Sequence, residues 1–295
     1  MIWVFPNRSF LIAYFEFRYF ERGNCWIAGI LARKDRLQSA MGMKRVEIFL
    51  QERLILDVTF PTMKFTISLF AALLCPISAI AEKKLIFEDD FERNESDDSK
   101  EEIGNGWTSN SAKRAKGNKQ VDLKDGAMHI TFHPAADHAV SVVHPVEFQN
   151  GKVSLRFRLP SEKDSLGLNF ADMKFKEVHA GHLCMTKIST TSVQINDLKT
   201  GVMANAMRKA KLDKTVTPEQ QKMLKTKTKR FKNKLEAGKW YSLEVTIKRD
   251  AMTVTIDGKE VGTFSSEGIA HPTKRALRVA IPKKAIIDDL KIYSL

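Results

Sequence analysis

Short segments in which apolar and polar residues alternate recur along the last two thirds of the chain, with turn residues between them. Residues 153–159, Val-Ser-Leu-Arg-Phe-Arg-Leu, alternate without a break, which is typical of a strand with one buried and one solvated face. Asp257-Gly258 stands between two such segments and is a strong signal for a two-residue hairpin turn. Strands are expected at 85–91, 127–133, 139–148, 152–159, 166–170, 183–189, 192–197, 240–248, 251–257, 260–264, 276–281 and 285–293.

The spacing of apolar residues changes from that of a strand to that of a helix between residues 203 and 236, where we expect a helical insertion. Thr217, Pro218 and Gln220 have the order of a capped helix start, with proline at the first helical position. Leu224, Phe231 and Leu235 then follow at helical spacing, and a shorter helix is expected before them, from Met203 to Lys211. Many short strands with one insertion predict an all-β fold, a two-sheet antiparallel β-sandwich of the jelly-roll kind with a basic helical insertion.

Positive charge is concentrated in that insertion. The whole chain has a formal net charge of +13, and residues 199–239 contain 13 Lys and Arg against three Asp and Glu. Lys222, Lys225 and Lys229 are expected to form a basic surface, either an ordinary solvated helix face or one that attracts an anionic polymer. We exclude nucleic acid as a partner, since aromatic residues are not interleaved with the lysines.

The first 81 residues have a different character. Residues 63–81 have a start methionine, one lysine, an apolar run and the small-x-small ending Ala79-Ile80-Ala81, which together predict a secretory signal peptide. Residues 1–62 are then best explained as a misassigned upstream extension, with a membrane-associated leader as the alternative. We expect a secreted or periplasmic mature domain of residues 82–295, with no stable membrane span after processing. That domain keeps one of the chain's three cysteines, Cys184, expected as a small core residue.

The order of several motifs adds a family resemblance. The segments 238–245, 253–258 and 287–292 resemble the hairpin and last strand of concanavalin A-like and laminin-G-like domains. Within that group the chain is most similar to the bacterial 3-keto-disaccharide hydrolases, which are relatives of family 16 glycoside hydrolases. The motifs that carry this likeness are 125–127, 148–151 with 156–158, and 193–197 with 200–201. The resemblance implies a carbohydrate ligand and, if the protein is an enzyme, hydrolysis of a glycosidic bond.

The candidate ligand-binding residues are His179, His182, Gln194, Asp197 and Trp107. Gly181 permits a turn that would bring the two histidine rings together, so a shared polar site, a metal site and separately hydrogen-bonded histidines all stay open. The resemblance implies that the stretch with Gln194 and Asp197 belongs to the site-bearing face. Trp107 is either a stacking platform for a sugar or a loop residue that anchors itself to the core.

Two acidic residues on the terminal strands are candidate metal ligands. Period two places Asp89 with Phe87, and Asp288 with Leu290, so both carboxylates are expected to point inward and to need partners. Backbone N–H groups, a lysine or a structural calcium ion could provide them. Apart from this calcium no cofactor is indicated.

Three functions remain in competition, the last of them a structural or protein-interaction domain. The first is an exported carbohydrate-binding or envelope-associated module, whose ligand includes acidic polysaccharides. The alternative is a glycoside hydrolase or lyase of the 3-keto-disaccharide hydrolase type. The binding function requires an exposed aromatic side chain and polar groups without a converging acid pair, whereas hydrolysis requires two carboxylates, or a histidine and a carboxylate, that converge in one concave pocket.

Overall fold

The computed structural model describes residues 56–60, 63–67 and 83–295. The chain divides into two compact units, residues 1–78 and 79–295. In the first unit β1 (Leu56–Phe60) and β2 (Met63–Ile67) form an antiparallel hairpin. Most of the expected signal peptide and of the upstream extension lies outside the described residues, and both assignments stay predictions.

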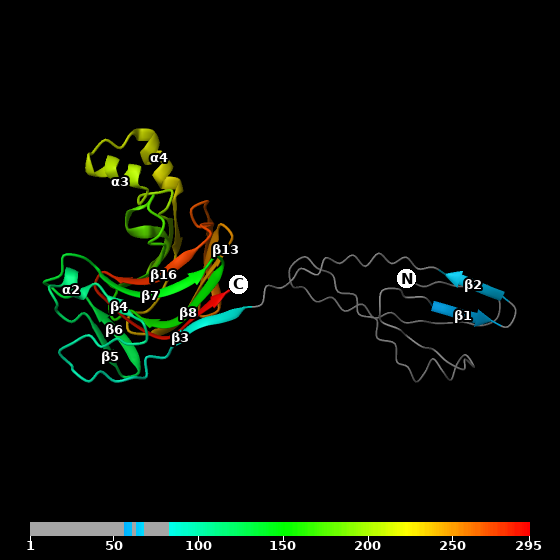
Figure 1. Ribbon diagram of the computed structural model, residues 1–295, viewed down its shortest axis with the longest axis horizontal. Coiled ribbons are helices and arrows are strands. Elements are labelled where there is room, and N and C mark those ends of the chain that lie inside the picture. Colours follow the sequence, from blue (N-terminus) through cyan, green and yellow to red (C-terminus); the bar gives the residue numbers. More distant parts are fainter. Residues whose placement is uncertain (1–55, 61–62, 68–82) are drawn as a thin grey trace. The chain divides into compact units, whose positions relative to one another are not determined.

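The second unit is a sandwich of two antiparallel sheets (Figure 1). The seven-stranded sheet has the strand order β12 (Thr228–Lys232), β11 (Ser192–Asp197), β10 (His182–Ser189), β9 (Ser165–Ala171), β16 (Lys274–Ile281), β7 (Val140–Phe148) and β4 (Thr108–Ser109). The eight-stranded sheet has the order β15 (Lys259–Ser265), β14 (Ala251–Ile256), β13 (Trp240–Lys248), β8 (Gly151–Arg158), β17 (Lys284–Ser294), β6 (Ala127–Thr131) and β5 (Val121–Lys124), with β3 (Lys84–Asp89) also paired to β17. This confirms the predicted fold class.

Alternation along the strands decides which side chains form the core. In β8, Val153, Leu155 and Phe157 are buried between the sheets, while Ser154 and Arg156 face outward. Burying an aliphatic or aromatic side chain of this size contributes about 1.5–3 kcal/mol, so a strand with three such residues has one strongly preferred register. All twelve strands expected from the sequence are present within two or three residues, whereas β4, β5 and β12 were not expected.

The segment 199–239, here called the basic arm, contains α3 (Asn205–Leu212) and α4 (Pro218–Thr226), drawn in yellow in Figure 1. The predicted helix start is confirmed: Thr217 and Gln220 form a reciprocal capping box, with Pro218 in the first turn. The predicted length of this helix is wrong. It ends at Thr226, and residues 228–232 form β12 at the edge of the sheet instead.

The reason for the early end is tertiary. Phe231 on β12 packs against the sandwich core, and a β-carbon on Gly262 of β15 would collide with its ring. The strand pairing and this contact outweigh the weak helical preference of the threonines and lysines at 226–232. The apolar spacing of Phe231 and Leu235 therefore reflects packing onto the core and not a helical stripe.

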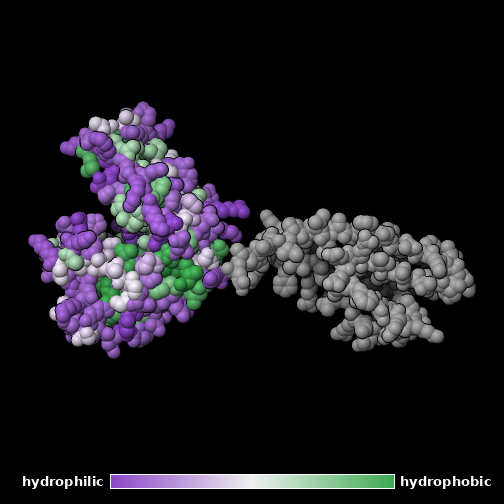
Figure 2. Space-filling view, in the orientation of Figure 1, coloured by the Kyte–Doolittle hydropathy of each residue, from purple (hydrophilic) through white to green (hydrophobic). Residues whose placement is uncertain are grey.

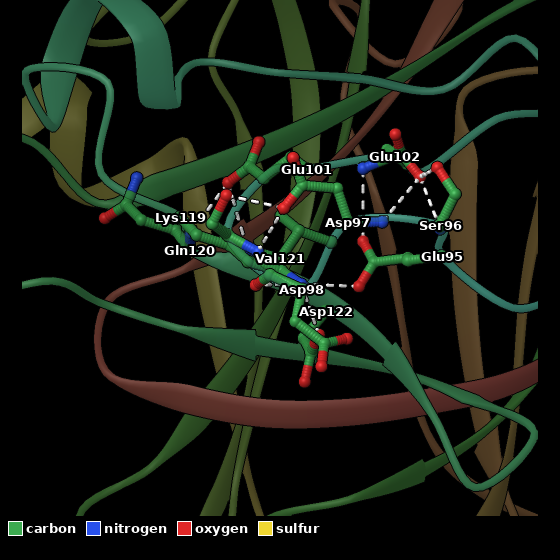
Figure 3. Close-up of polar contacts among 11 residues, drawn as sticks. Glu95, Ser96, Asp97, Asp98, Glu101, Glu102, Lys119, Gln120, Val121 and Asp122 are labelled. Atoms are coloured by element: carbon green, nitrogen blue, oxygen red, sulfur yellow. Dashed lines mark hydrogen bonds and ion pairs between the residues drawn. The ribbon is translucent and has the colours of Figure 1, made fainter.

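An acidic segment near the start of the domain is held by its own carboxylates (Figure 3). Glu101 accepts hydrogen bonds from Ser111 Oγ at 2.5 Å and from the backbone N–H groups of Gln120 and Val121 at 2.6 and 3.0 Å. Lys119 donates to Glu95 Oε2 at 2.5 Å. These contacts attach the segment 95–102 to the start of β5.

Among the described helices, none is long and apolar enough to cross a bilayer.

Candidate functional site

A short loop carries the two candidate histidines. Between β9 and β10 the chain forms the 3-10 turn η1 (His179–Gly181), in which Ala180 and Gly181 have positive φ angles of 49° and 68°. A β-carbon on Gly181 would collide with the backbone carbonyl of Asp172, so only glycine fits. The turn brings the rings of His179 and His182 to a centroid separation of 6.4 Å, as the glycine predicted.

His182 is oriented by an amide from the neighbouring strand. Its Nδ1 lies 3.1 Å from Oδ1 of Asn169 on β9. A carboxamide oxygen only accepts, so in this pair Nδ1 carries the proton and Nε2 is left as an acceptor. Burial, followed by the positive charges of Arg278, His179 and His138, lowers the pKa of His182 to about 4. The imidazole is therefore neutral at pH 7.

Arg278 on β16 completes this cluster, here called the histidine site: His179, His182, Asn169 and Arg278. Its Nη2 donates to the carbonyl oxygen of Ala180 at 2.9 Å and lies 3.0 Å from the sulfur of Met173. Its Nη1 lies 3.4 Å from His182 Nδ1. The guanidinium thus supports the histidine loop from the open face of the seven-stranded sheet, meaning the face turned away from the core.

The first helix of the basic arm borders the histidine site. The N–H of His179 donates to Met203 O at 2.8 Å, and the N–H of Asn205 donates to Glu177 O at 3.0 Å. These two bonds fix the start of α3 against the loop. Loss of hydration, and then the charges of Arg208 on α3 and of Arg278, lower the pKa of His179.

Gln194 lies on the open face but apart from the histidines. Its neighbour on β10 is Lys187, five residues along the strand from His182, which corresponds to about 16 Å of strand rise. Gln194 Nε2 donates to Asn196 Oδ1 at 2.7 Å, and Arg230 donates to Gln194 Oε1 at 3.1 Å. The structure therefore gives Gln194 its own polar cluster at the β11–β12 end of the face.

Asp197 was expected in the same site, and the structure contradicts this. It shares its side of β11 with the core residues Val193 and Ile195, and it is 1% exposed. Its carboxylate accepts hydrogen bonds from Thr200, from Ser266 Oγ at 2.6 Å and from the N–H of Gly268 at 3.0 Å. Period two along the strand put Asp197 opposite to Gln194, and its role is to join β11 to the loop after β15.

Trp107 was considered as a stacking platform, and the structure contradicts that interpretation. It is 5% exposed and packs edge-on against Phe87, close to the rings of Phe91 and His144. Its Nε1–H donates to Asp89 Oδ2 at 2.8 Å. The loop tryptophan anchors itself to the core, which was the alternative considered from the sequence.

Asp89 points inward as expected, but its partners are donors. Arg93 donates to both carboxylate oxygens at 2.6 and 3.0 Å, and the N–H of Phe91 donates to Oδ1 at 2.9 Å. Burial opposes ionisation of Asp89, yet the hydrogen bonds from Arg93, Phe91, Asn105 and Trp107 outweigh it and lower the pKa. A carboxylate surrounded in this way does not fit a calcium ligand.

Asp288 was expected to point inward as well, and here the expectation is wrong. A register shift between Asp288 and Lys291, with Asp289 at a φ of 48°, inverts the alternation along β17. Asp288 therefore faces outward and lies 3.2 Å from Arg156 Nη1. Within the described part of the chain, no three His, Cys, Asp or Glu side chains gather where they could hold a metal ion.

The outer face of the eight-stranded sheet holds the domain's other tryptophan. Trp240 is on the outward side of β13, half-buried beneath the guanidinium groups of Arg156 and Arg158. The two guanidinium carbons lie 5.0 and 5.1 Å from its ring centroid. Trp240 therefore takes part in a cation–π stack on the opposite side of the sandwich from the histidine site.

The three lysines chosen as a basic surface are all exposed, but they do not share one helix. Lys222 and Lys225 are on α4, whereas Lys229 is on β12 beside Ile195. Figure 2 shows that the surface of the basic arm is mostly hydrophilic. Lys209 and Lys227 pair with Asp213 and Glu267, and no other ion pair involves a lysine or arginine of the arm among the described residues.

Carboxylates are scarce on the open face. Of the described strand residues that point outward from β11, β10, β9, β16 and β7, Glu147 at the end of β7 is the one carboxylate, and it pairs with Arg275. Two further acids are near the histidine loop. Asp172 is buried and accepts from Arg275 Nη1 at 2.5 Å and from the N–H of Lys174, whereas Glu177, two residues before His179, is exposed. A pair of free carboxylates, as glycosidic hydrolysis requires, is not assembled beside the histidines.

Three residues of the site were missed from the sequence: Asn169, Arg208 and Arg278. A signal existed for Arg278, since it is a charged residue between the buried Leu277 and Val279 and so had to face outward. What placed it beside the histidines is the pairing of β16 with β9, where Arg278 is directly opposite Asn169. Strand pairing between residues 109 positions apart is not encoded in a local pattern.

No family model matches the sequence, and no curated protein matches it either. Several solved structures align with parts of the chain at low identity. A carbohydrate-binding module, CBM66, from Bacillus subtilis aligns at 10% identity and a TM-score of 0.41, covering 64% of this chain and 96% of that one. The laminarinase from Rhodothermus marinus aligns at 10% identity and a TM-score of 0.48, covering 72% and 98%.

A third structure, the GlcNAcα1-4Gal-releasing endo-β-galactosidase from Clostridium perfringens, aligns at 10% identity and a TM-score of 0.47. The alignment covers 72% of this chain and 63% of the galactosidase.

Proposed function

We propose that residues 82–295 form an exported, noncatalytic carbohydrate-binding module that holds its ligand on the open face of the seven-stranded sheet. The histidine site supports this proposal most directly. A neutral His182, whose Nδ1 is held by Asn169, keeps Nε2 as an acceptor, and the guanidinium of Arg278 lies against the same ring, 3.4 Å from Nδ1. Sugar hydroxyls both donate and accept, so they pair with an acceptor and a donor held side by side.

A second polar cluster on the same face supports an extended ligand. Gln194 is joined to Asn196, Thr228 and Arg230 by hydrogen bonds of 2.7 to 3.1 Å, about 16 Å along the sheet from His182. Two fixed polar clusters at that distance suit an oligosaccharide better than a single sugar. Export follows from the signal-like segment 63–81 and makes the cell envelope or its surroundings the place of action.

The basic arm would add a non-specific attraction for acidic polysaccharides. Lys222, Lys225 and Lys229 are exposed and without an ion-pair partner among the described residues. Attraction by exposed lysines is screened over about 8 Å at physiological ionic strength. Replacing all three by glutamine should therefore weaken binding of an acidic glycan at low salt and change little at high salt.

Hydrolysis of a glycosidic bond, in the manner of the 3-keto-disaccharide hydrolases, is the alternative that the sequence motifs imply. The scarcity of free carboxylates on the open face speaks against it and favours binding. A histidine with a pKa near 4 is also a poor general base at pH 7, since the base strength of an imidazole falls with its pKa.

The proposal is tested with a glycan array, followed by calorimetry and an activity screen on each ligand that binds. Wild-type protein should bind at least one glycan without cleaving it, and His182→Ala should lower that affinity at least tenfold. Trp240→Ala is the matched control, because it alters an aromatic residue on the other sheet and should leave binding unchanged. Turnover of a bound glycan would favour the hydrolase. If His182→Ala binds as well as the wild type, the assignment of the open face fails.

A further inference from the structure

We infer that the histidine site selects an anionic group on its sugar ligand, a carboxylate or a sulfate ester, and that Arg278 is the residue that recognises it. This inference rests on the proposed carbohydrate-binding function and narrows it to one chemical class of glycan. The observation that supports it is that Arg278 has no negatively charged partner in the histidine site.

Several arginines elsewhere in this domain form an ion pair with a carboxylate, whereas Arg278 does not. Arg93 pairs with Asp89 at 2.6 Å, Arg275 with Asp172 at 2.5 Å and Arg114 with Asp137 at 3.0 Å. The acceptors of Arg278 are the carbonyl oxygen of Ala180 and the sulfur of Met173, and its third neighbour is the His182 ring, which is neutral at pH 7. The guanidinium is thus half-buried without a counterion.

The surroundings of Arg278 increase this excess of positive charge. Arg208 is on α3, whose start is hydrogen-bonded to the histidine loop, and the pKa of His179 is lowered by burial and then by the charges of Arg208 and Arg278. No ion pair involves Arg208 or Arg278 within residues 83–295. Asp172 and Glu147 are both paired with Arg275, and Glu177, two residues before His179, is exposed and forms no ion pair with either arginine.

Leaving a charged group partly desolvated without an opposite charge is unfavourable, and a ligand that brings the missing charge recovers that free energy on binding. A guanidinium has five N–H donors in a fixed fork, and the contacts of Arg278 with Ala180 and Met173 do not use them all. The fork matches the oxygens of a carboxylate or a sulfate, which makes the contact directional and not only attractive.

The lysines of the basic arm do not account for such selectivity. Lys222 and Lys225 are exposed and flexible, so they raise the affinity for any polyanion and lose that effect in salt. Arg278 is held by three neighbours, so it should discriminate between a charged sugar and its neutral counterpart at physiological salt. The response to salt and to ligand charge therefore distinguishes the contribution of Arg278 from that of the lysines of the basic arm.

The test compares ligands that differ only in charge. Calorimetry at 0.15 M salt is run on the full chain with an oligogalacturonate and its methyl-esterified form, and with dextran sulfate and unmodified dextran. The acidic member of at least one pair should bind tenfold or more tighter than its neutral counterpart. The pair that shows this preference identifies the group as a carboxylate or as a sulfate ester.

Variants then assign the preference to a residue. Arg278→Gln, which keeps a donor for Ala180, should reduce the acid-to-neutral ratio to near one, and Arg278→Lys should keep part of it. Arg208→Gln, on the surface of α3, is the second variant in case Arg278→Gln unfolds, and it should lower the ratio severalfold. Arg156→Gln is the matched control, an exposed arginine on the outer face of the other sheet that should leave the ratio unchanged.

Equal binding of acidic and neutral ligands, or an unchanged ratio in Arg278→Gln, would overturn the inference while sparing the carbohydrate-binding function. Absence of binding to every glycan tested would overturn both. A single-stranded oligonucleotide is included as a further polyanion, and if it binds more tightly than the acidic glycans the ligand class is wrong.

Discussion

The indole N–H of Trp107 donates a 2.8 Å hydrogen bond to Oδ2 of Asp89, a residue 18 positions earlier in the chain. Both residues were candidate ligand-binding groups in the sequence, and this contact gives both a structural role instead. The ring that could have stacked on a sugar is buried against Phe87, and the carboxylate that could have held calcium is shared between Arg93 and the indole.

Trp107→Phe should destabilise the domain because it removes a hydrogen bond to a buried carboxylate while it keeps an aromatic ring. The expected loss is about 1–3 kcal/mol of unfolding free energy, measured by urea denaturation. Trp240→Phe serves as the control, since Trp240 is half-buried and its ring contacts are retained; its cost should stay well below 1 kcal/mol. Equal costs for the two variants would contradict the role given to the Asp89 contact.

His182 should make stability depend on pH between about 6.5 and 4. Its pKa is about 4 in the folded protein, against about 6.5 in an unfolded chain, so the unfolded state binds the proton first as the pH falls. The stabilising contribution is fully present above pH 6.5 and is lost as the pH approaches 4. His182→Asn should flatten this part of the profile relative to wild type, and an NMR titration of the His182 ring should report a pKa near 4.

Substitutions at Gly181 and Gly238 distinguish two ways in which an added side chain destabilises the domain: backbone strain at a positive φ angle and steric collision with a neighbour. Both have positive φ angles, 68° and 79°, but a β-carbon would meet the backbone of Asp172 only at Gly181. Alanine at either position should cost about 1 kcal/mol from backbone strain, and Gly181→Ala should cost more because the loop must move. It should also weaken glycan binding, since the rings of His179 and His182 would separate, whereas Gly238→Ala should bind normally.

Phe231 and Gly262 should be energetically coupled, because the phenyl ring occupies the space next to the glycine. Gly262→Ala should destabilise the domain by about 1–3 kcal/mol through overpacking. The same substitution in a Phe231→Ala background should cost much less, so a double-mutant cycle measured by chemical denaturation should show strong non-additivity. Additive costs would mean that β12 does not pack here.

Processing of the native protein tests the interpretation of its first 81 residues. If residues 63–81 are a signal peptide, mature protein isolated from the producing cells should begin at or near Glu82. N-terminal sequencing and peptide mass spectrometry provide the measurement. Peptides from residues 1–62 in the mature protein would show that this segment is a translated and retained part of the chain.

The sequence alone determined the features that depend on neighbours along the chain. Alternation in β8 and β13 fixed their buried faces, Asp257-Gly258 fixed the hairpin between β14 and β15, and Thr217 with Gln220 fixed the start of α4. Each of these rests on backbone geometry or hydrogen bonds within a few residues, so a local pattern is sufficient to predict it.

Tertiary structure decided the features that depend on distant partners. The shift in β17 turned Asp288 outward, the contact with Gly262 converted residues 228–232 from helix to strand, and the pairing of β16 with β9 placed Arg278 opposite Asn169. The free energy in these cases comes from packing and pairing between segments far apart in sequence, which an alternation pattern does not contain. The histidine turn lies between the two: Gly181 permitted it, and the strands that hold Asn169 and Arg278 gave it neighbours.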